Sequence, residues 1–204
     1  MDPNTFPTKG NLIRAKNSLV LARQGYGLMD KKRNILIREL MNLIDEAKGI
    51  QSEIDTTFRA AYAALQKANI ELGINYVQEV GVSVPVDDGV HIKARSIMGT
   101  EIPLVRHEEK PMELTYGFYN TSQSLDEARY HFEKVKELTI RLSMVENAAY
   151  RLANSIKKTQ KRANALKNIT IPKYEALSKS ISEALEEKER EEFTRLKVIK
   201  QNKR

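Results

Sequence analysis

The sequence predicts a mainly α-helical fold: a long antiparallel two-helix coiled coil, with a small β-hairpin head in the middle of the chain. Apolar residues recur at helical spacing toward both ends, whereas the middle is rich in Val and Ile separated by turn signals. Charged residues make up 30% of the 204 residues, and 9 Gly and 6 Pro are few for this length, which favours long helices. The expected divisions are an N-terminal coiled-coil helix at 1–72, a head at 73–118 and a C-terminal coiled-coil helix at 119–204.

The first helix is expected from about residue 12 to residue 72. Its apolar or small residues follow alternating steps of three and four from Leu12 to Ala68, and only Arg33 and Thr57 are polar exceptions. A straight helix drifts by about 20° per seven residues against such a repeat, so the helix must supercoil around a partner that covers this seam. The alternative is an ordinary amphipathic helix of a globular bundle, but such helices rarely exceed about 20 residues.

The middle segment reads as two or three short strands. Turn signals occur at "DDG" and "MGT", and the sequences "HIKAR" and "EIPLV" on either side of the second turn are rich in strand-forming residues. Gly73 and Gly117 lie in the connectors to the long helices. We therefore expect a hairpin in this head.

The second long helix is expected to begin near Ser124, a plausible N-cap that is followed by Asp126 and Glu127 in the first turn. Its seam continues with apolar residues from Leu125 to Leu166. Two such seams joined by a compact β segment fold back most simply as an antiparallel pair.

Pro172 interrupts this second helix, because an interior proline removes one hydrogen bond and clashes with the preceding turn at a cost of about 3 kcal/mol. Apolar spacing nevertheless resumes with Tyr174, Leu177 and Ile181. Either the helix kinks and continues, or it stops at Asn168 and restarts with Pro172 at its first position. Both alternatives predict a bend near residue 172.

The end of the chain is expected to extend beyond its partner. The two seams pair best when facing positions sum to about 197, a register in which residue 12 lies opposite residue 185. The stretch 186–200 then forms a single helix, supported by acidic residues placed three or four positions before Arg190 and Arg195. Its apolar stripe has no partner in this chain and is a predicted partner-binding surface: Phe193, Leu196 and Ile199.

The sequence contains no recognisable catalytic or cofactor site. It has no cysteine, and His91, His107 and His131 lack the spacing of metal ligands. We found no glycine-rich phosphate loop and no nucleophile elbow. The start of the chain lacks a signal peptide, and no apolar run approaches the roughly 20 residues that span a bilayer. The chain is therefore expected to be no enzyme, to hold no cofactor or metal, and to have no direct membrane insertion.

The net charge of +7 is concentrated in residues 119–204, which contain 19 Lys and Arg against 12 Asp and Glu. Within them, a basic run lies away from the seam: Lys157, Lys158, Lys161 and Arg162. This run is a candidate surface for an acidic protein, with a solvated coiled-coil flank as the alternative. Nucleic-acid binding would require a broader basic stripe with stacking aromatic residues.

Three stretches resemble the terminal helices of the D subunit of V-type and A-type rotary ATPases. These are "FPTKGNLIRAKNSLVLARQGYGLMDKKRNIL" near the start, "KRANALKNITIPKYE" around Pro172, and "LEEKEREEFTRLKVIK" near the end. The resemblance implies a non-catalytic central-stalk rotor subunit. Such a rotor transmits torque between an ATP-hydrolysing or ATP-synthesising hexamer and a membrane ring that translocates ions.

The resemblance also implies partners and a location. The partners are the catalytic and non-catalytic nucleotide-binding subunits of the hexamer, the small F subunit of the stalk, and a funnel-shaped subunit on the membrane ring, with no nucleic acid. The chain would be cytoplasmic, and peripheral at the cytoplasmic face of the membrane. The basic run would face acidic loops of the hexamer, and the stripe at 193–199 would sit in its bore. The alternative is a free-standing basic coiled-coil scaffold or nucleic-acid-binding protein, whose binding would depend strongly on salt.

Overall fold

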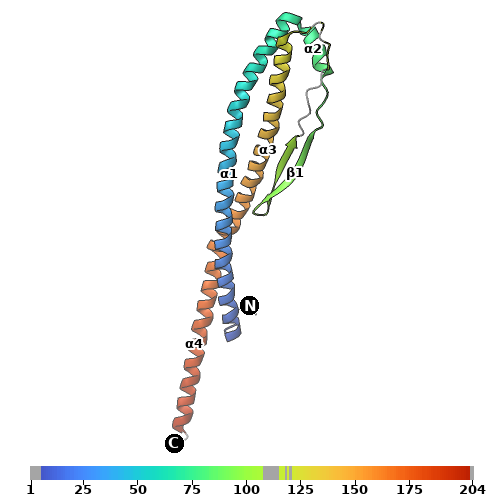
Figure 1. Ribbon diagram of the computed structural model, residues 1–204. Coiled ribbons are helices and arrows are strands. Elements are labelled where there is room, and N and C mark those ends of the chain that lie inside the picture. Colours follow the sequence, from blue (N-terminus) through green and yellow to red (C-terminus); the bar gives the residue numbers. More distant parts are fainter. Residues whose placement is uncertain (1–5, 108–114, 118, 120, 203–204) are drawn as a thin grey trace. The chain divides into compact units, whose positions relative to one another are not determined.

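A computed structural model describes residues 6–107, 115–117, 119 and 121–202 of the chain. These fall into two compact units, unit 1 (Met1–Ile35 with Ile156–Arg204) and unit 2 (Leu36–Ser155). The expected fold class is confirmed, because long helices dominate the described residues and a small two-stranded antiparallel sheet lies in the middle of the chain (Figure 1).

Helix α1 (Lys9–Leu72) is a single helix of 64 residues. At its start the Thr8 hydroxyl accepts a hydrogen bond of 3.2 Å from the Asn11 amide, as an N-cap side chain does. At its end Gly73 has φ 86°, a left-handed conformation that glycine adopts without strain. Along the helix, buried seam residues recur at multiples of seven: Ala15, Ala22, Leu36, Ile50 and Thr57.

Helix α2 (Ile74–Ser83) follows directly, where the sequence predicted strands. Its Val80 is buried in a cluster with Ala68 and Leu125, and Val77 packs against the same cluster. The spacing of these residues is helical, but a short valine-rich run does not distinguish a helix from a strand. Tertiary packing therefore decides that this segment is a helix.

The predicted hairpin is confirmed as β1 (Val90–Ile97) paired with β2 (Thr100–His107). Met98 and Gly99 join the strands with φ 50° and 72°, the two positive values of a type I′ turn. Strand β2 is fastened to helix α3 (Gln123–Ala165), alongside which the hairpin lies (Figure 1). Three contacts hold it there: Thr100 Oγ1 to Ser155 Oγ at 2.8 Å, the Val105 amide to Met144 Sδ at 3.2 Å, and Arg151 to the Glu101 carbonyl at 3.4 Å.

Helix α3 begins at Gln123, so Ser124 is its second residue and not the expected N-cap. Ser124 is only 2% exposed, and its hydroxyl donates to the carboxylate of Glu71 at the end of α1. Hydrogen bonds from Ser124 and then Ser122 lower the pKa of Glu71. The serine thus joins two helices of unit 2.

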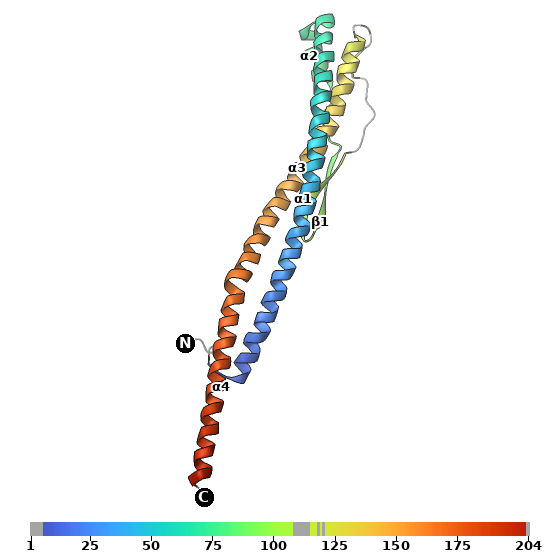
Figure 2. The same ribbon diagram turned by 90° about the vertical axis from the view of Figure 1, so that its left-hand side faces the viewer.

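In unit 1 the helix pairing is antiparallel, as predicted. Lys9 contacts Glu189 at 3.1 Å and Arg23 contacts Glu175 at 2.7 Å, and the positions of each pair add to 198 against the expected 197. In both ion pairs the partner of α1 is helix α4 (Ile171–Asn202). Helix α4 continues past the first turn of α1 (Figure 2).

Candidate partner-binding surfaces

The basic run lies on the last turns of α3. All four side chains, those of Lys157, Lys158, Lys161 and Arg162, are exposed, whereas Thr159 and Ala163 between them are 4% and 1% exposed. No ion pair within the described part of the chain joins any of the four to a carboxylate. The run is therefore a positive surface without local compensation, and its role in binding stays a prediction.

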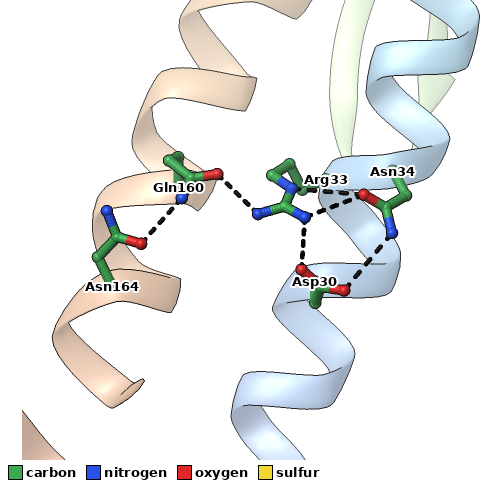
Figure 3. A network of polar contacts seen from close by, with 5 residues as sticks. All are labelled: Asp30, Arg33, Asn34, Gln160 and Asn164. Atoms are coloured by element: carbon green, nitrogen blue, oxygen red, sulfur yellow. Dashed lines mark hydrogen bonds and ion pairs between the residues drawn. The ribbon is translucent and has the colours of Figure 1, made fainter. Parts of the chain in front are cut away.

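A polar network occupies another flank of the same helix pair (Figure 3). Arg33 contacts Asp30 at 2.6 Å and donates to Gln160 at 2.9 Å, and Gln160 in turn donates to Asn164 at 2.8 Å. This network explains how a charged residue is accommodated in the seam of α1. It also leaves this flank electrically neutral, because the guanidinium of Arg33 is paired with the carboxylate of Asp30.

The basic run spans two faces of α3. Lys158 and Arg162 lie about 200° around the helix from Gln160 and Asn164, whereas Lys157 and Lys161 lie only about 60° from these two residues, on the outer face. Unit 1 therefore presents Lys158 and Arg162 on the flank opposite the closed hydrogen-bonded network.

Residues 186–202 of α4, the C-terminal tip, are all exposed. Their apolar stripe comprises Phe193 (70% exposed), Leu196 (65%) and Ile199 (52%).

Two of the predicted ion pairs within the tip are present, Glu186–Arg190 at 3.9 Å and Glu191–Arg195 at 4.0 Å. The predicted pairs of Glu187 and Glu192 with the same arginines do not form within the described chain. Each pair that forms stabilises a helix by about 0.2–0.5 kcal/mol. These two pairs and the contact of Glu189 with Lys9 of α1 therefore support the tip.

Pro172 follows a π-helical turn that the sequence analysis missed. Leu166–Thr170 form this turn, and α4 begins directly after it at Ile171. The helix therefore does not stop at Asn168 as one alternative required, and the change of direction near Pro172 stays a prediction. The missed signal is a step of eight residues, from Leu166 to Tyr174, in a seam that repeats every seven residues from Leu138 to Leu166.

A second polar cluster lies in unit 2 at the base of the hairpin. The Asp87 carboxylate accepts hydrogen bonds from Lys136 at 2.9 Å, from the Gly89 amide at 2.9 Å and from His107 Nε2 at 2.6 Å. These three bonds hold the pKa of Asp87 well below its usual range, and the bond from Lys136 lowers it most. His107 is the last residue of β2 and Lys136 lies on α3, so the cluster ties the hairpin to α3.

Among the described residues, no group of three or more His, Cys, Asp or Glu side chains is arranged to hold a metal ion. Within the same residues, no helix combines the length and apolar character needed to cross a membrane.

Comparison with known proteins points to one family. The ATP synthase D subunit family matches residues 11–201. The V-type ATP synthase D subunit of Thermotoga neapolitana is 46% identical over 195 residues, covering 96% of each chain. The A-type ATP synthase D subunits of Thermococcus kodakarensis and Pyrococcus furiosus are 37% and 38% identical, over 97% and 95% of this chain and 94% and 92% of those proteins.

Proposed function

This chain belongs to the ATP synthase D subunit family, and on that premise we propose which of its surfaces meet the other subunits of the complex. It is a non-catalytic, central-stalk rotor subunit of a V/A-type rotary ATPase, and it transmits torque between ATP chemistry and ion translocation. The alternative of a free-standing scaffold or nucleic-acid-binding protein is not favoured, because the match covers residues 11–201.

The C-terminal tip is the part that we assign to the bore of the nucleotide-binding hexamer. The observation that carries this assignment is the exposed stripe of Phe193, Leu196 and Ile199 on a helix that lies beyond the start of α1. Burying an exposed Phe or Leu side chain contributes about 1.5–3 kcal/mol, so three such residues supply substantial binding energy to a partner.

The basic run is assigned to acidic loops of the same hexamer. Its four cations have no carboxylate partner within the described chain, whereas the flank with Arg33 and Gln160 is already satisfied. Contact with acidic loops would therefore depend on the angle of the rotor. The expected bend near Pro172 would add to this asymmetry.

The other end of α1 is assigned to the funnel-shaped subunit on the membrane ring. Large apolar side chains are exposed around α2, including Ile74 (69%), Val82 (82%) and Val86 (94%). An exposed apolar group of this kind suits a protein interface. The small F subunit of the stalk is the remaining partner, and the chain would lie peripherally at the cytoplasmic face of the membrane.

Recovery of the complex tests the assignment of the tip. The triple variant Phe193→Ser, Leu196→Ser, Ile199→Ser, carried on a tagged chain, should recover less of the two nucleotide-binding subunits, as measured by pull-down and mass spectrometry. A matched control, Glu187→Ser, Glu191→Ser, Thr194→Ser, changes the opposite face of the same exposed helix and should recover them fully.

Both triple variants should unfold at the same temperature as the native free chain, because all six residues are exposed. Equal recovery of the nucleotide-binding subunits by the two variants would contradict the assignment of the tip to the bore.

A further inference from the structure

The π-helical turn at Leu166–Thr170 contains one residue more than an α-helical turn. The Ile171 amide donates to the Leu166 carbonyl, five residues back, where an α-helix bonds four residues back. The flanking residues are ordinary helix, with φ −63° and ψ −42° at Ala165 and φ −61° and ψ −53° at Ile171. The extra residue is therefore confined to this one turn.

The buried and half-buried seam positions of unit 1 record the same extra residue. On α1 they recur every seven residues without interruption, at Ala15, Ala22 and the half-buried Met29. On the facing α3–α4 helix the steps are seven, eight and seven, at Thr159, Leu166, Tyr174 and Ile181, of which Leu166 and Tyr174 are half-buried. The step of eight spans the π-turn. One residue too many thus lies on the α3–α4 side, and the π-turn absorbs it.

The consequence is a matter of rotation. Each α-helical residue turns the chain by about 100°, so an uninterrupted α-helix would carry Tyr174 and Ile181 about 100° away from the seam. Ile181 is instead 2% exposed in the observed fold. The π-turn keeps α4 facing α1.

Two features confine the turn to this place. If it moved past Pro172 toward the tip, residues 168–172 would form an ordinary α-helical turn, in which the proline ring clashes with the carbonyl of Asn168. If it moved the other way, it would first rotate Leu166 out of the seam, where that side chain lies 3.7 Å from the position of a Cβ on Gly25. It would then rotate Ala163, which is 1% exposed.

Contacts between the helices bracket the same turn. Arg33 bonds Gln160 before it, and Arg23 pairs with Glu175 after it. The Thr170 hydroxyl also donates to the Ala165 carbonyl at 3.4 Å, across the turn itself. The π-turn thus lies between two positions at which α1 is bonded to the α3–α4 helix.

We propose that Pro172 is a positioning residue that locks this one-residue offset in place and so fixes the direction in which α4 and its tip face. Without the lock, the turn can travel along α4, and each residue that it passes rotates by about 100° relative to α1. In a rotor such travel is slippage, because the tip turns while the rest of the helix pair does not. This last step alone rests on the proposed function.

Distance measurement on the free full-length chain tests the lock. The chain has no cysteine, so Gln24→Cys and Lys173→Cys, both at exposed positions of unit 1, accept a pair of spin labels without other changes. The native background should give one distance. Pro172→Ala should add a second distance, because residue 173 is the first position that a moving turn rotates. The control Lys179→Ala should not add one. A single, unchanged distance in Pro172→Ala would overturn the lock.

Deletions test the offset separately. Removing Asn168 in the Pro172→Ala background should convert the turn into α-helix, restore a single distance and leave the unfolding temperature at or above that of Pro172→Ala. Removing Lys179 in that background should lower the unfolding temperature, because it rotates Ile181 out of the seam. An equal loss on both deletions would overturn the one-residue offset.

A measurement of coupling in the assembled complex tests whether the lock on the π-turn matters for torque transmission. Pro172→Ala should reduce ion translocation per ATP hydrolysed, while Lys179→Ala should not. Full coupling alongside a second spin-label distance would overturn the role in torque and leave the lock standing.

Discussion

The helix pairs of units 1 and 2 are both built on a seven-residue spacing, with one step of eight in unit 1, but they bury different side chains along it. Unit 2 encloses large residues, with Leu36 and Leu152 at 0% exposure and Val145 at 1%. Aromatic rings flank this core, where the exposed Tyr62 contacts the half-buried Phe58 and Phe132 at centroid distances of 5.7 and 5.6 Å. Unit 1 encloses one large residue, Ile181 at 2%, and otherwise small or polar ones: Ala15, Ala22, Thr159 and Ala163.

The difference follows from what each seam has to do. A fully buried Leu contributes about 1.5–3 kcal/mol, whereas a buried Ala contributes far less because it has one methyl group to bury. Unit 2 is therefore stabilised by its own core. Unit 1 has a thin seam and leaves its cations and its tip exposed, which suits a segment completed by partner subunits.

The largest expected effect contrasts one substitution in the two units. Leu152→Ala in unit 2 should lower the free energy of unfolding by about 2–5 kcal/mol, because it leaves a cavity in a closed core. Leu177→Ala in unit 1 removes the same atoms from a half-buried position and should cost clearly less. Urea denaturation of the free chain measures both. Equal losses would remove the contrast between the seams.

The second prediction concerns acid and the hairpin of unit 2. The folded-state pKa of Asp87 is lowered, so its contribution to stability is present above the unfolded value of about 4 and is lost as pH falls below it. The protection of the β1 and β2 amides, measured as the exchange rate relative to the unfolded chain at the same pH, should therefore fall below that pH. Asp87→Asn should show the low protection already at neutral pH and lose its dependence on acid.

The matched control for this prediction is Asp55→Asn, at an exposed carboxylate on α1 of the same unit. It should leave exchange in the strands unchanged. Slow exchange in Asp87→Asn at neutral pH would show that the contacts of β2 with Met144 and Ser155 hold the hairpin without the carboxylate.

Local signals in the sequence predicted the elements that local chemistry determines. Gly73 marks the end of α1, and the glycines of "DDG" and "MGT" mark the two turns that bound β1. The seam spacing predicted which helix faces are buried, from Ala15 to Ala68 on α1 and from Leu125 to Ala163 on α3. These features depend on neighbours within a few turns.

The remaining features depend on partners far apart in the chain. Helix α2 exists because Val80 packs on Ala68 and Leu125, and the Asp87 cluster joins residues 20 and 49 positions away in His107 and Lys136. No local pattern identifies such groups. The π-turn is intermediate between locally and distantly determined features. The sequence contains its signal, a step of eight residues, but the step can be interpreted only when the seam is known to continue on both sides of it.

A smaller effect on the free chain is expected from the basic run. Replacing Lys157, Lys158, Lys161 and Arg162 with Ala should change the free energy of unfolding by less than about 0.5 kcal/mol per site, because all four are exposed. It should weaken binding to the hexamer, and the loss should shrink as added salt screens the charges.

The control for the basic run changes the same amount of charge elsewhere. Ala at Arg38, Lys48, Arg59 and Lys67, four exposed cations on α1 of unit 2, should bind the hexamer with nearly native affinity. Similar losses in both quadruple variants would mean that net charge and not the position of the run matters.

The smallest effect is expected in the tip, where the contrast with unit 2 is greatest. Glu186 and Glu191 precede their arginine partners by four residues, and their side chains are 64% and 61% exposed. Two such pairs contribute under about 1 kcal/mol together, and only to the helix that contains them. Glu186→Gln with Glu191→Gln should therefore leave global unfolding unchanged and accelerate amide exchange only within the tip.

High salt should abolish that difference in exchange, because it screens exposed ion pairs. Glu187→Gln with Glu192→Gln is the matched control, since it removes the same charge from residues that make no ion pair within the described chain. If the two double variants exchange alike, net charge and not pairing supports the tip. If neither double variant differs from the native chain in amide exchange, the ion pairs within the tip do not stabilise its helix. That result would contradict the interpretation of the tip as a helix that supports itself until a partner subunit binds.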